Sequence, residues 1–145
     1  DLNVFFKAQV LFWLLAAGDG HAKNFSLRIL PQGRYHLTPL YDVLSYWPIV
    51  GRGASKLPLQ RVRMAMAVRG KNKHYLLTQI KRGHFVETAA RAGIGKEAGE
   101  RLVEEIAERT PQVIDELQQS LPKGFPSRIA DPIFTGLRRQ AANLG

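Results

Sequence analysis

Residues 18–24 read Gly-Asp-Gly-His-Ala-Lys-Asn, and residues 41–43 read Tyr-Asp-Val. The segment between them has two short runs of strand-forming residues around Pro-Gln-Gly-Arg, which predicts a β-hairpin. Because a hairpin returns the chain to where it started, we expect Asn24 and Asp42 to be neighbours, with Asp19 beside them. The pattern therefore predicts that three oxygen-bearing side chains converge at one end of a hairpin and face a shared cleft.

These three side chains suit phosphoryl transfer. One carboxylate can orient an attacking hydroxyl and accept its proton, while a carboxamide and a second carboxylate offer hard oxygen ligands to the Mg²⁺ of a nucleotide. The order Asp-x-x-x-x-Asn, hairpin, Asp is that of the catalytic loop and metal-binding Asp in protein kinases. An isolated Asp-Gly or Lys-Asn is ordinary turn chemistry, so the prediction depends on the whole ordered set.

The rest of the chain predicts a mainly helical domain with one small hairpin, occupying residues 1–145 as a single unit. Residues 3–17 are apolar nearly all round, which indicates a helix buried on most faces and ended by Gly18 and Gly20. Residues 46–58 read as a loop that is rich in Gly, Pro and Ser. Further helices are expected at 72–81, 84–92, 97–109, directly after 110–111, and at about 127–143.

Two local signals refine this scheme. Thr110-Pro111 has the form of an N-cap followed by a first-turn proline, so it predicts that a new helix begins there. Pro132 either kinks the last helix or marks its start. Trp13 and Trp47 are expected in the core, with nucleotide stacking as the alternative.

The net charge of +9 comes from one central segment, residues 52–91. This segment has ten Lys and Arg against the single acid Glu87, whereas the rest of the chain is balanced. Such a segment points to a polyanion or an acidic partner, and a solvated surface is the competing interpretation. The residues expected to make the contact are Arg69, Lys71, Lys73, Lys81 and Arg82.

Composition narrows the classes of protein and of site that the chain can represent. The chain has no cysteine, which excludes disulfides and thiolate metal sites. Its longest apolar run, residues 10–17, is too short to span a bilayer and lacks the flanks of a secretory signal, so we expect no membrane contact. The absence of cysteine suits the cytoplasmic location that we expect. The chain opens on Asp1 with no initiator Met, which we interpret as part of a longer protein.

The motif resembles that of a known family. Gly-Asp-Gly-His-Ala-Lys-Asn-Phe-Ser at 18–26 and Leu-Thr-Pro-Leu-Tyr-Asp-Val-Leu-Ser at 37–45 resemble the HipA family of serine/threonine protein kinases, the toxins of bacterial toxin–antitoxin pairs. The likeness continues at 63–67, 83–85 and 120–122. It implies a protein-kinase-like C-terminal lobe, with Asp19 as catalytic base, Asn24 and Asp42 as magnesium ligands, and ATP with Mg²⁺ as cofactors.

Two departures from ordinary protein kinases are tolerated in this family. Val43-Leu44 follows the second Asp where Phe-Gly is usual, and no Arg precedes Asp19. His21 is expected to brace the loop, and Lys23 either contacts a phosphate or faces solvent. Because lipid kinases have a similar Asp-x-His-x-x-Asn loop, a lipid or small-molecule kinase stays an alternative.

The resemblance also implies partners. These are an N-terminal kinase lobe, a DNA-binding antitoxin, operator DNA bound through the complex, and a protein substrate, an aminoacyl-tRNA synthetase, whose phosphorylation arrests translation and leads to persistence. No Gly-rich phosphate loop and no strand with a nucleotide-pairing Lys precede residue 18, so the chain alone is expected to be inactive. A different class of function is a nucleic-acid- or antitoxin-binding module that uses residues 52–91.

Overall fold

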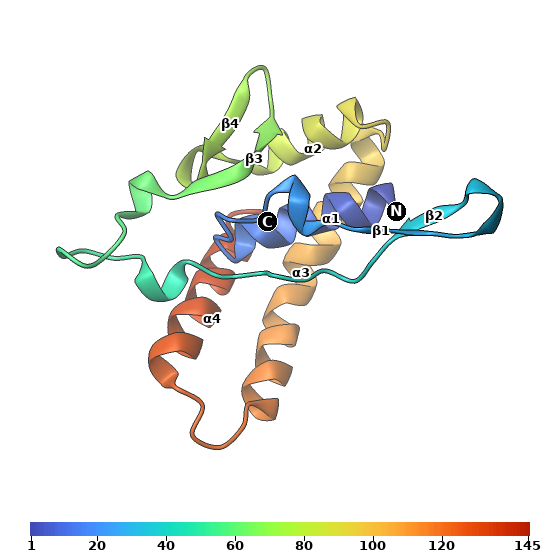
Figure 1. Ribbon diagram of the computed structural model, residues 1–145. Helices are drawn as coiled ribbons and strands as arrows, with labels where there is room; N and C mark the ends of the chain where they lie inside the picture. Colours follow the sequence, from blue (N-terminus) through green and yellow to red (C-terminus); the bar gives the residue numbers. More distant parts are fainter.

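The computed structural model describes residues 1–145 and is mainly helical, with two small antiparallel strand pairs (Figure 1). This confirms the predicted fold class, although the sequence indicated only one of the two pairs. The elements in chain order are α1 (Leu2–Leu14), β1 (Leu27–Ile29), β2 (Tyr35–Leu37), β3 (Arg63–Arg69), β4 (Lys73–Leu76), α2 (Arg82–Arg91), α3 (Lys96–Ser120) and α4 (Ser127–Ala142). Short 3₁₀ turns lie between them.

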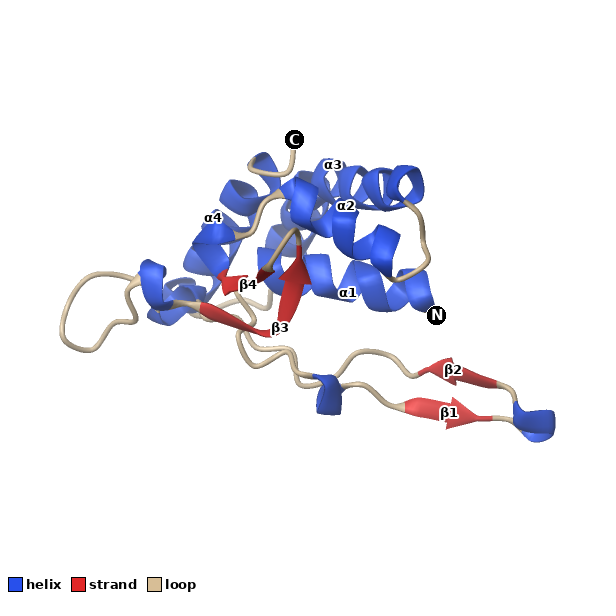
Figure 2. Ribbon diagram, turned by 90° about the horizontal axis from the view of Figure 1, so that it is seen from above, coloured by secondary structure: helices blue, strands red, loops and turns tan.

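Helix α1 is the centre of the core. As its apolar composition predicts, it is buried on several faces, and it packs against both α3 and α4 (Figures 1 and 2). Its Phe12, Trp13 and Leu14 belong to one hydrophobic cluster of 22 buried residues. The following turn therefore starts from a fixed support.

Helices α3 and α4 form an antiparallel pair, and α2 packs against α3 at the opposite end from the α3–α4 loop (Figure 1). Arg138 on α4 donates to Asp115 on α3 at 2.6 Å. Gly93, with φ +84°, ends α2 as expected. No helix in the chain combines the length and the apolar character that a membrane crossing requires.

The first hairpin follows the prediction closely. Strands β1 and β2 pair with Leu27 opposite Leu37 and Ile29 opposite Tyr35, and the connection contains Gln32 and Gly33 at positive φ. The pair extends away from the helical body (Figure 2). Consequently Leu27, Ile29 and Tyr35 are all exposed.

The helix predicted over residues 72–81 is wrong. Residues 73–76 form β4, which pairs with β3 through a bulge, and a 3₁₀ turn at Leu77–Gln79 follows. Leu77 and Ile80 are buried with Val68 of β3 and with Val62 directly before it, so tertiary packing decides the conformation. The helix-like spacing of Leu77 and Ile80 arises because the 3₁₀ turn between β4 and α2 separates them.

The break predicted at 110–111 is also wrong, because α3 runs unbroken through both residues. Thr110 does not cap a new helix, since its Oγ1 bonds back to the Ile106 carbonyl at 2.6 Å. Pro132 likewise lies inside α4 and does not start it. In both helices the apolar face packed on the core outweighs the local cost of a proline.

Both tryptophans lie in the core, as expected. Trp13 donates its indole N–H to the Leu77 carbonyl at 3.0 Å, and Trp47 donates to the Leu14 carbonyl at 2.8 Å. Neither ring is free to stack on a nucleotide. The second bond joins the segment that follows the first hairpin to the end of α1.

Candidate functional site

The loop at 18–24 begins in a tight turn after α1. Ala16, at φ +49°, makes the reversal after α1, and not Gly18 or Gly20 as the sequence predicts. Gly18 and Gly20 are needed for space, since a Cβ on Gly18 would lie 2.5 Å from the Tyr46 ring and one on Gly20 would overlap the Phe12 ring. The loop backbone is therefore pressed against the core.

Asn24 joins the two halves of the motif. It ends the 3₁₀ turn Ala22–Asn24 and is only 5% exposed. Its amide nitrogen donates to the Asp19 carbonyl at 3.2 Å and to the Asp42 carbonyl at 3.4 Å. The structure thus brings the Asp42 backbone to the Asn24 side chain, as hairpin geometry predicted, and the Asp19 backbone lies against the same amide.

Several further bonds fix the strand that returns from the hairpin. Tyr41 donates its hydroxyl to the Lys23 carbonyl at 3.2 Å, and the same hydroxyl lies 2.8 Å from Ser26 Oγ. Ser45 donates to the Leu15 carbonyl at 2.6 Å. Asp42 is thereby held between two anchored residues, which the motif alone did not reveal.

Asp42 has a strained backbone, with φ +54°. A non-glycine residue in this region costs energy, and such strain is concentrated at functional sites. Asp19 and Asp42 are both exposed while Asn24 is buried beneath them. The arrangement presents two carboxylates to solvent on a rigid base.

The donor set of this site is oxygen only. The Asn24 amide nitrogen is occupied by two carbonyls, so its Oδ1 is the atom left for a ligand. Two carboxylates with one amide oxygen suit a hard cation such as Mg²⁺ when substrate oxygens and water complete the shell. No group of three or more His, Cys, Asp or Glu that could hold a metal ion by itself occurs in the chain.

His21 and Lys23 surround the same loop. His21 Nε2 lies 3.8 Å from Asp19 Oδ1, and its Nδ1 is enclosed without a hydrogen-bond partner. Lys23 is exposed. His21 therefore lies where it can brace the Asp19 side chain, and Lys23 where it can reach a solvent-borne anion.

The expected cleft is not formed by this chain alone. None of the four main hollows is lined by Asp19, Asn24 or Asp42. Asp19 and Asp42 are both exposed, and the segments that contain them lead into and out of the projecting first hairpin (Figure 2).

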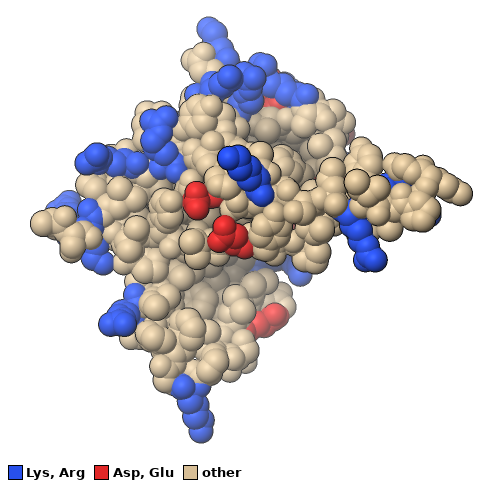
Figure 3. Space-filling model, viewed as in Figure 1, with Lys and Arg blue, Asp and Glu red and all other residues tan.

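The basic segment forms a separate surface. Lys and Arg atoms gather over β3, β4 and α2 in Figure 3, where few acidic atoms lie among them. Lys71 and Lys73 are exposed at the tip of the second hairpin, and Lys81 is exposed at the start of α2. Arg69 is exposed and Arg82 is partly buried, and none of these five residues forms an ion pair with a carboxylate.

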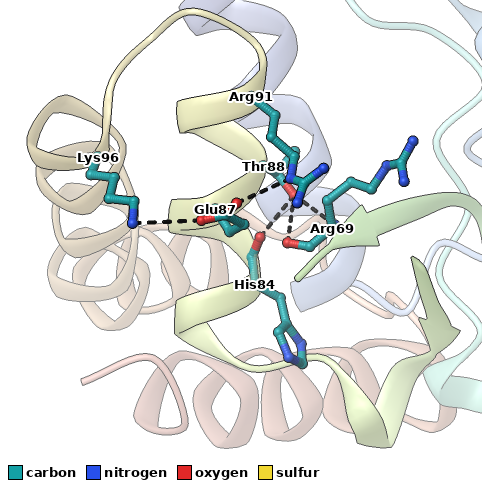
Figure 4. Close-up of polar contacts among 6 residues, drawn as sticks. All are labelled: Arg69, His84, Glu87, Thr88, Arg91 and Lys96. Atoms are coloured by element: carbon teal, nitrogen blue, oxygen red, sulfur yellow. Dashed lines mark hydrogen bonds and ion pairs between the residues drawn. The ribbon is translucent and has the colours of Figure 1, made fainter. Parts of the chain in front are cut away.

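Figure 4 shows how this surface is braced. Thr88 on α2 accepts the Arg69 backbone N–H at 2.7 Å and donates to the His84 carbonyl at 2.8 Å. Glu87, the one acid of the segment, lies 3.1 Å from Arg91 and 3.7 Å from Lys96. The acid is used internally, which leaves the cations of the second hairpin unneutralised.

A stacked histidine pair on this surface was not foreseen. His74 of β4 and His84 of α2 lie parallel with their ring centroids 3.9 Å apart. Partial burial, then the neighbouring His74 and Lys81 charges, lower the pKa of His84. No sequence signal indicates the pair, because it depends on the second hairpin that the sequence did not predict.

Residues 1–114 match the family of HipA-like C-terminal domains. A chain in the solved complex of HipA, HipB and operator DNA, from the toxin–antitoxin system of Shewanella oneidensis MR-1, superposes on 96% of this chain. Its TM-score is 0.76 and its sequence identity is 20%, so this likeness shows a shared fold. The present chain spans 30% of the length of that relative.

Proposed function

This chain belongs to the family of HipA-like C-terminal domains, and we propose that it is the catalytic-loop lobe of a serine/threonine protein kinase, the toxin of a bacterial toxin–antitoxin pair. The observation that supports the proposal best is the buried Asn24 amide, which bonds to the carbonyls of both Asp19 and Asp42. Such a clamp holds the backbones of two residues with solvent-facing carboxylates in a fixed relation, and phosphoryl transfer depends mainly on positioning and charge stabilisation.

In this proposal Asp19 orients the substrate hydroxyl and accepts its proton. Asp42 and the free Asn24 Oδ1 would hold Mg²⁺, which would supply positive charge to offset that of the ATP phosphates. His21 braces Asp19, and Lys23 lies at the edge of the loop where it can approach a phosphate oxygen. The substrate class is a protein Ser or Thr, with an aminoacyl-tRNA synthetase as the candidate.

The open position of the two carboxylates supports a second lobe as partner. More than half of the relative's length lies outside the matched part, and we propose that a corresponding segment covers the nucleotide. Mg-ATP titrated calorimetrically into the 145-residue chain should bind weakly, with a dissociation constant on the order of millimolar. Adding the N-terminal lobe in trans should tighten binding, whereas tight binding by the chain alone would contradict the proposal.

The roles are tested by mutation in the full-length protein. Asp19→Asn and Asp42→Asn should each lower phosphoryl transfer from radiolabelled ATP by about 10²-fold or more. The first removes a positioned proton acceptor, and the second removes a carboxylate that would hold Mg²⁺. Glu108→Gln is the matched control, because Glu108 is an exposed acid without an ion pair on α3. Circular dichroism checks folding, and wild-type transfer by either aspartate variant would refute the assignment.

A second function is favoured by the unpaired cations of the basic segment. We propose that Arg69, Lys71, Lys73, Lys81 and Arg82 contact operator DNA or an acidic face of the antitoxin. The relative's complex contains HipB and operator DNA, and phosphate contacts in general are made by unpaired Lys and Arg.

The salt dependence of duplex binding tests this second function. Replacing Lys71 and Lys73 with Gln should flatten the log–log slope by roughly one unit for each phosphate that the protein no longer neutralises. The control replaces Lys123, an exposed lysine in the α3–α4 loop, with Gln. An unchanged slope in the double variant would leave these cations as a solvated surface.

A further inference from the structure

A hollow of about 550 Å³ lies where the approach to α2 meets the C-terminal end of α4. Lys81, Arg82, Arg139 and Gln140 are among its lining residues, and no Asp or Glu lines it. It contains none of the catalytic-loop residues, so it is separate from the proposed kinase site, and it shares Lys81 and Arg82 with the basic surface described above.

Its three cations have no carboxylate partner, and two of them are held in place. Arg82 donates from Nη1 to the Leu144 carbonyl at 3.0 Å, which fixes the guanidinium while leaving its other N–H groups free. The Arg139 guanidinium carbon lies 4.7 Å from the centre of the Trp47 ring. A stacked guanidinium keeps its N–H edge available for an anion.

Gln140 supplies the independent observation. It is only 6% exposed, and its Nε2 has no hydrogen-bond partner. Its Oε1 accepts from Asn143 Nδ2 at 3.3 Å, so the amide orientation is already set and Nε2 is the atom left over. A buried donor without an acceptor is rare in folded proteins, so we expect a ligand atom to accept a hydrogen bond from it.

The N-terminus of α2 adds donors of the same kind. The helix is ten residues long and begins at Arg82, so the first backbone N–H groups, at Arg82 and Gly83, have no acceptor within the helix. A Cβ on Gly83 would meet no atom within 4 Å, so the backbone there is open to a ligand. Helix N-termini attract anions through these groups and through the helix dipole.

We propose that this hollow binds a single phosphate group. The groups described above are all donors or cations, and no carboxylate lines the hollow to repel an anion. Two fixed guanidinium groups, a flexible ammonium and a helix N-terminus match the several acceptor oxygens of a phosphate, and a turn of the enclosed Gln140 side chain would add its unpartnered amide. The site does not depend on the proposed kinase function.

The test uses the Gln140 side-chain amide as its reporter. In a ¹⁵N-correlated spectrum the Gln140 NH₂ signals are identified by their loss in Gln140→Leu, and inorganic phosphate is titrated against chloride at matched ionic strength. We expect a saturable shift of those signals in the wild type. Calorimetric titration of phosphate, which does not need the Gln140 signal, should show an affinity loss of about tenfold in Gln140→Leu, which corresponds to about 1.4 kcal/mol. Lys81→Gln should also weaken binding, whereas Lys123→Gln removes the same charge from a distant loop and should not.

Glycerol 3-phosphate and a duplex oligonucleotide carry the same group from two sources. If glycerol 3-phosphate binds and the duplex does not displace it, the ligand is a small phosphorylated molecule. If the duplex displaces glycerol 3-phosphate, the ligand is a nucleic-acid backbone. The proposal fails if phosphate does not shift the Gln140 amide, or if Lys123→Gln weakens binding as much as Lys81→Gln. Should Gln140→Leu fail to fold, the comparison of phosphate binding by Lys81→Gln and Lys123→Gln still tests the proposal, because both side chains are exposed and neither change should affect folding.

Discussion

Replacing Asn24 should lower the stability of the fold. Of the substitutions in the loop, it tests most directly whether the Asn24 side chain holds the Asp19 and Asp42 backbones in place. Its amide makes two hydrogen bonds, at 3.2 and 3.4 Å, which are at the long end of the N–H···O range. Each therefore contributes toward the lower half of the usual ~0.5–1.5 kcal/mol. With the lost burial, we expect Asn24→Ala to lower the free energy of unfolding by about 1–2 kcal/mol.

Asn24→Asp is the sharper test because it keeps the size and one oxygen but removes both donors. A carboxylate at this buried position would face the Asp19 and Asp42 carbonyls, so we expect a further loss of about 1–3 kcal/mol at pH 7. Burial beside two carbonyls would raise the pKa of the new carboxyl group. Because the folded state then binds the proton more tightly, the difference between Asn24→Asp and Asn24→Ala should shrink as the pH falls from 7 toward 4.

Urea denaturation followed by tryptophan fluorescence measures these effects, since both Trp13 and Trp47 are buried. A loss of about 1–2 kcal/mol corresponds to a midpoint shift of about 1 M at a typical slope. Asn72, exposed in the second hairpin, is the control, and its changes to Ala and Asp should stay within about 0.5 kcal/mol. A wild-type midpoint for Asn24→Ala, or an Asn24→Asp variant no weaker than Asn24→Ala at pH 7, would refute the clamp.

Three other outcomes follow from the structure. A hydrogen bond from Lys7 lowers the pKa of Glu105 below its ordinary 4.5. The pair therefore stabilises the fold fully above pH 4.5, and this stabilisation is lost as the pH falls through the lower pKa of the folded state. Lys7→Met should therefore reduce the drop in melting temperature between pH 6 and 3. Gly20→Ala, which forces a Cβ into an aromatic ring of α1, should cost about 1–3 kcal/mol in urea unfolding, whereas Gly83→Ala in open space on α2 should not destabilise. Pro111→Ala should raise the free energy of unfolding by about 1–3 kcal/mol, since proline inside a helix costs about 3 kcal/mol, and a lower melting temperature would contradict this.

The parts of the fold that were predicted depend on local chemistry. The continuous apolar composition of α1 indicates a buried helix whatever the neighbours are. The Pro-Gln-Gly-Arg connection determines the first hairpin, and the return geometry of a hairpin then brings Asp42 to Asn24. Each of these steps uses residues close in sequence, which is why the sequence alone indicates the motif's geometry.

The parts that were missed depend on contacts between distant segments. Residues 73–76 become a strand because β3 is available as a partner, and α3 continues through Pro111 because its apolar face is already packed. The hollow near Gln140 joins α2 to the end of α4, so its unpartnered amide cannot be seen along the sequence. Likewise, in the turn after α1 the positive φ falls on Ala16 and not on Gly18 or Gly20. These two glycines are needed because a Cβ on them would collide with the rings of Tyr46 and Phe12.

The strained backbone of Asp42 and the clamp by Asn24 explain each other. A residue at φ +54° persists only where its surroundings hold it, and the bond from Asn24 to the Asp42 carbonyl is one such restraint. The anchors at Tyr41 and Ser45 are two more. The position of the Asp42 carboxylate is thus coupled to a buried side chain, so a substitution at Asn24 that keeps an oxygen ligand would still release Asp42. In the proposed kinase, Asn24→Asp should therefore lower phosphoryl transfer even where magnesium is supplied in excess, because added metal cannot restore the donors that fix the Asp42 carbonyl.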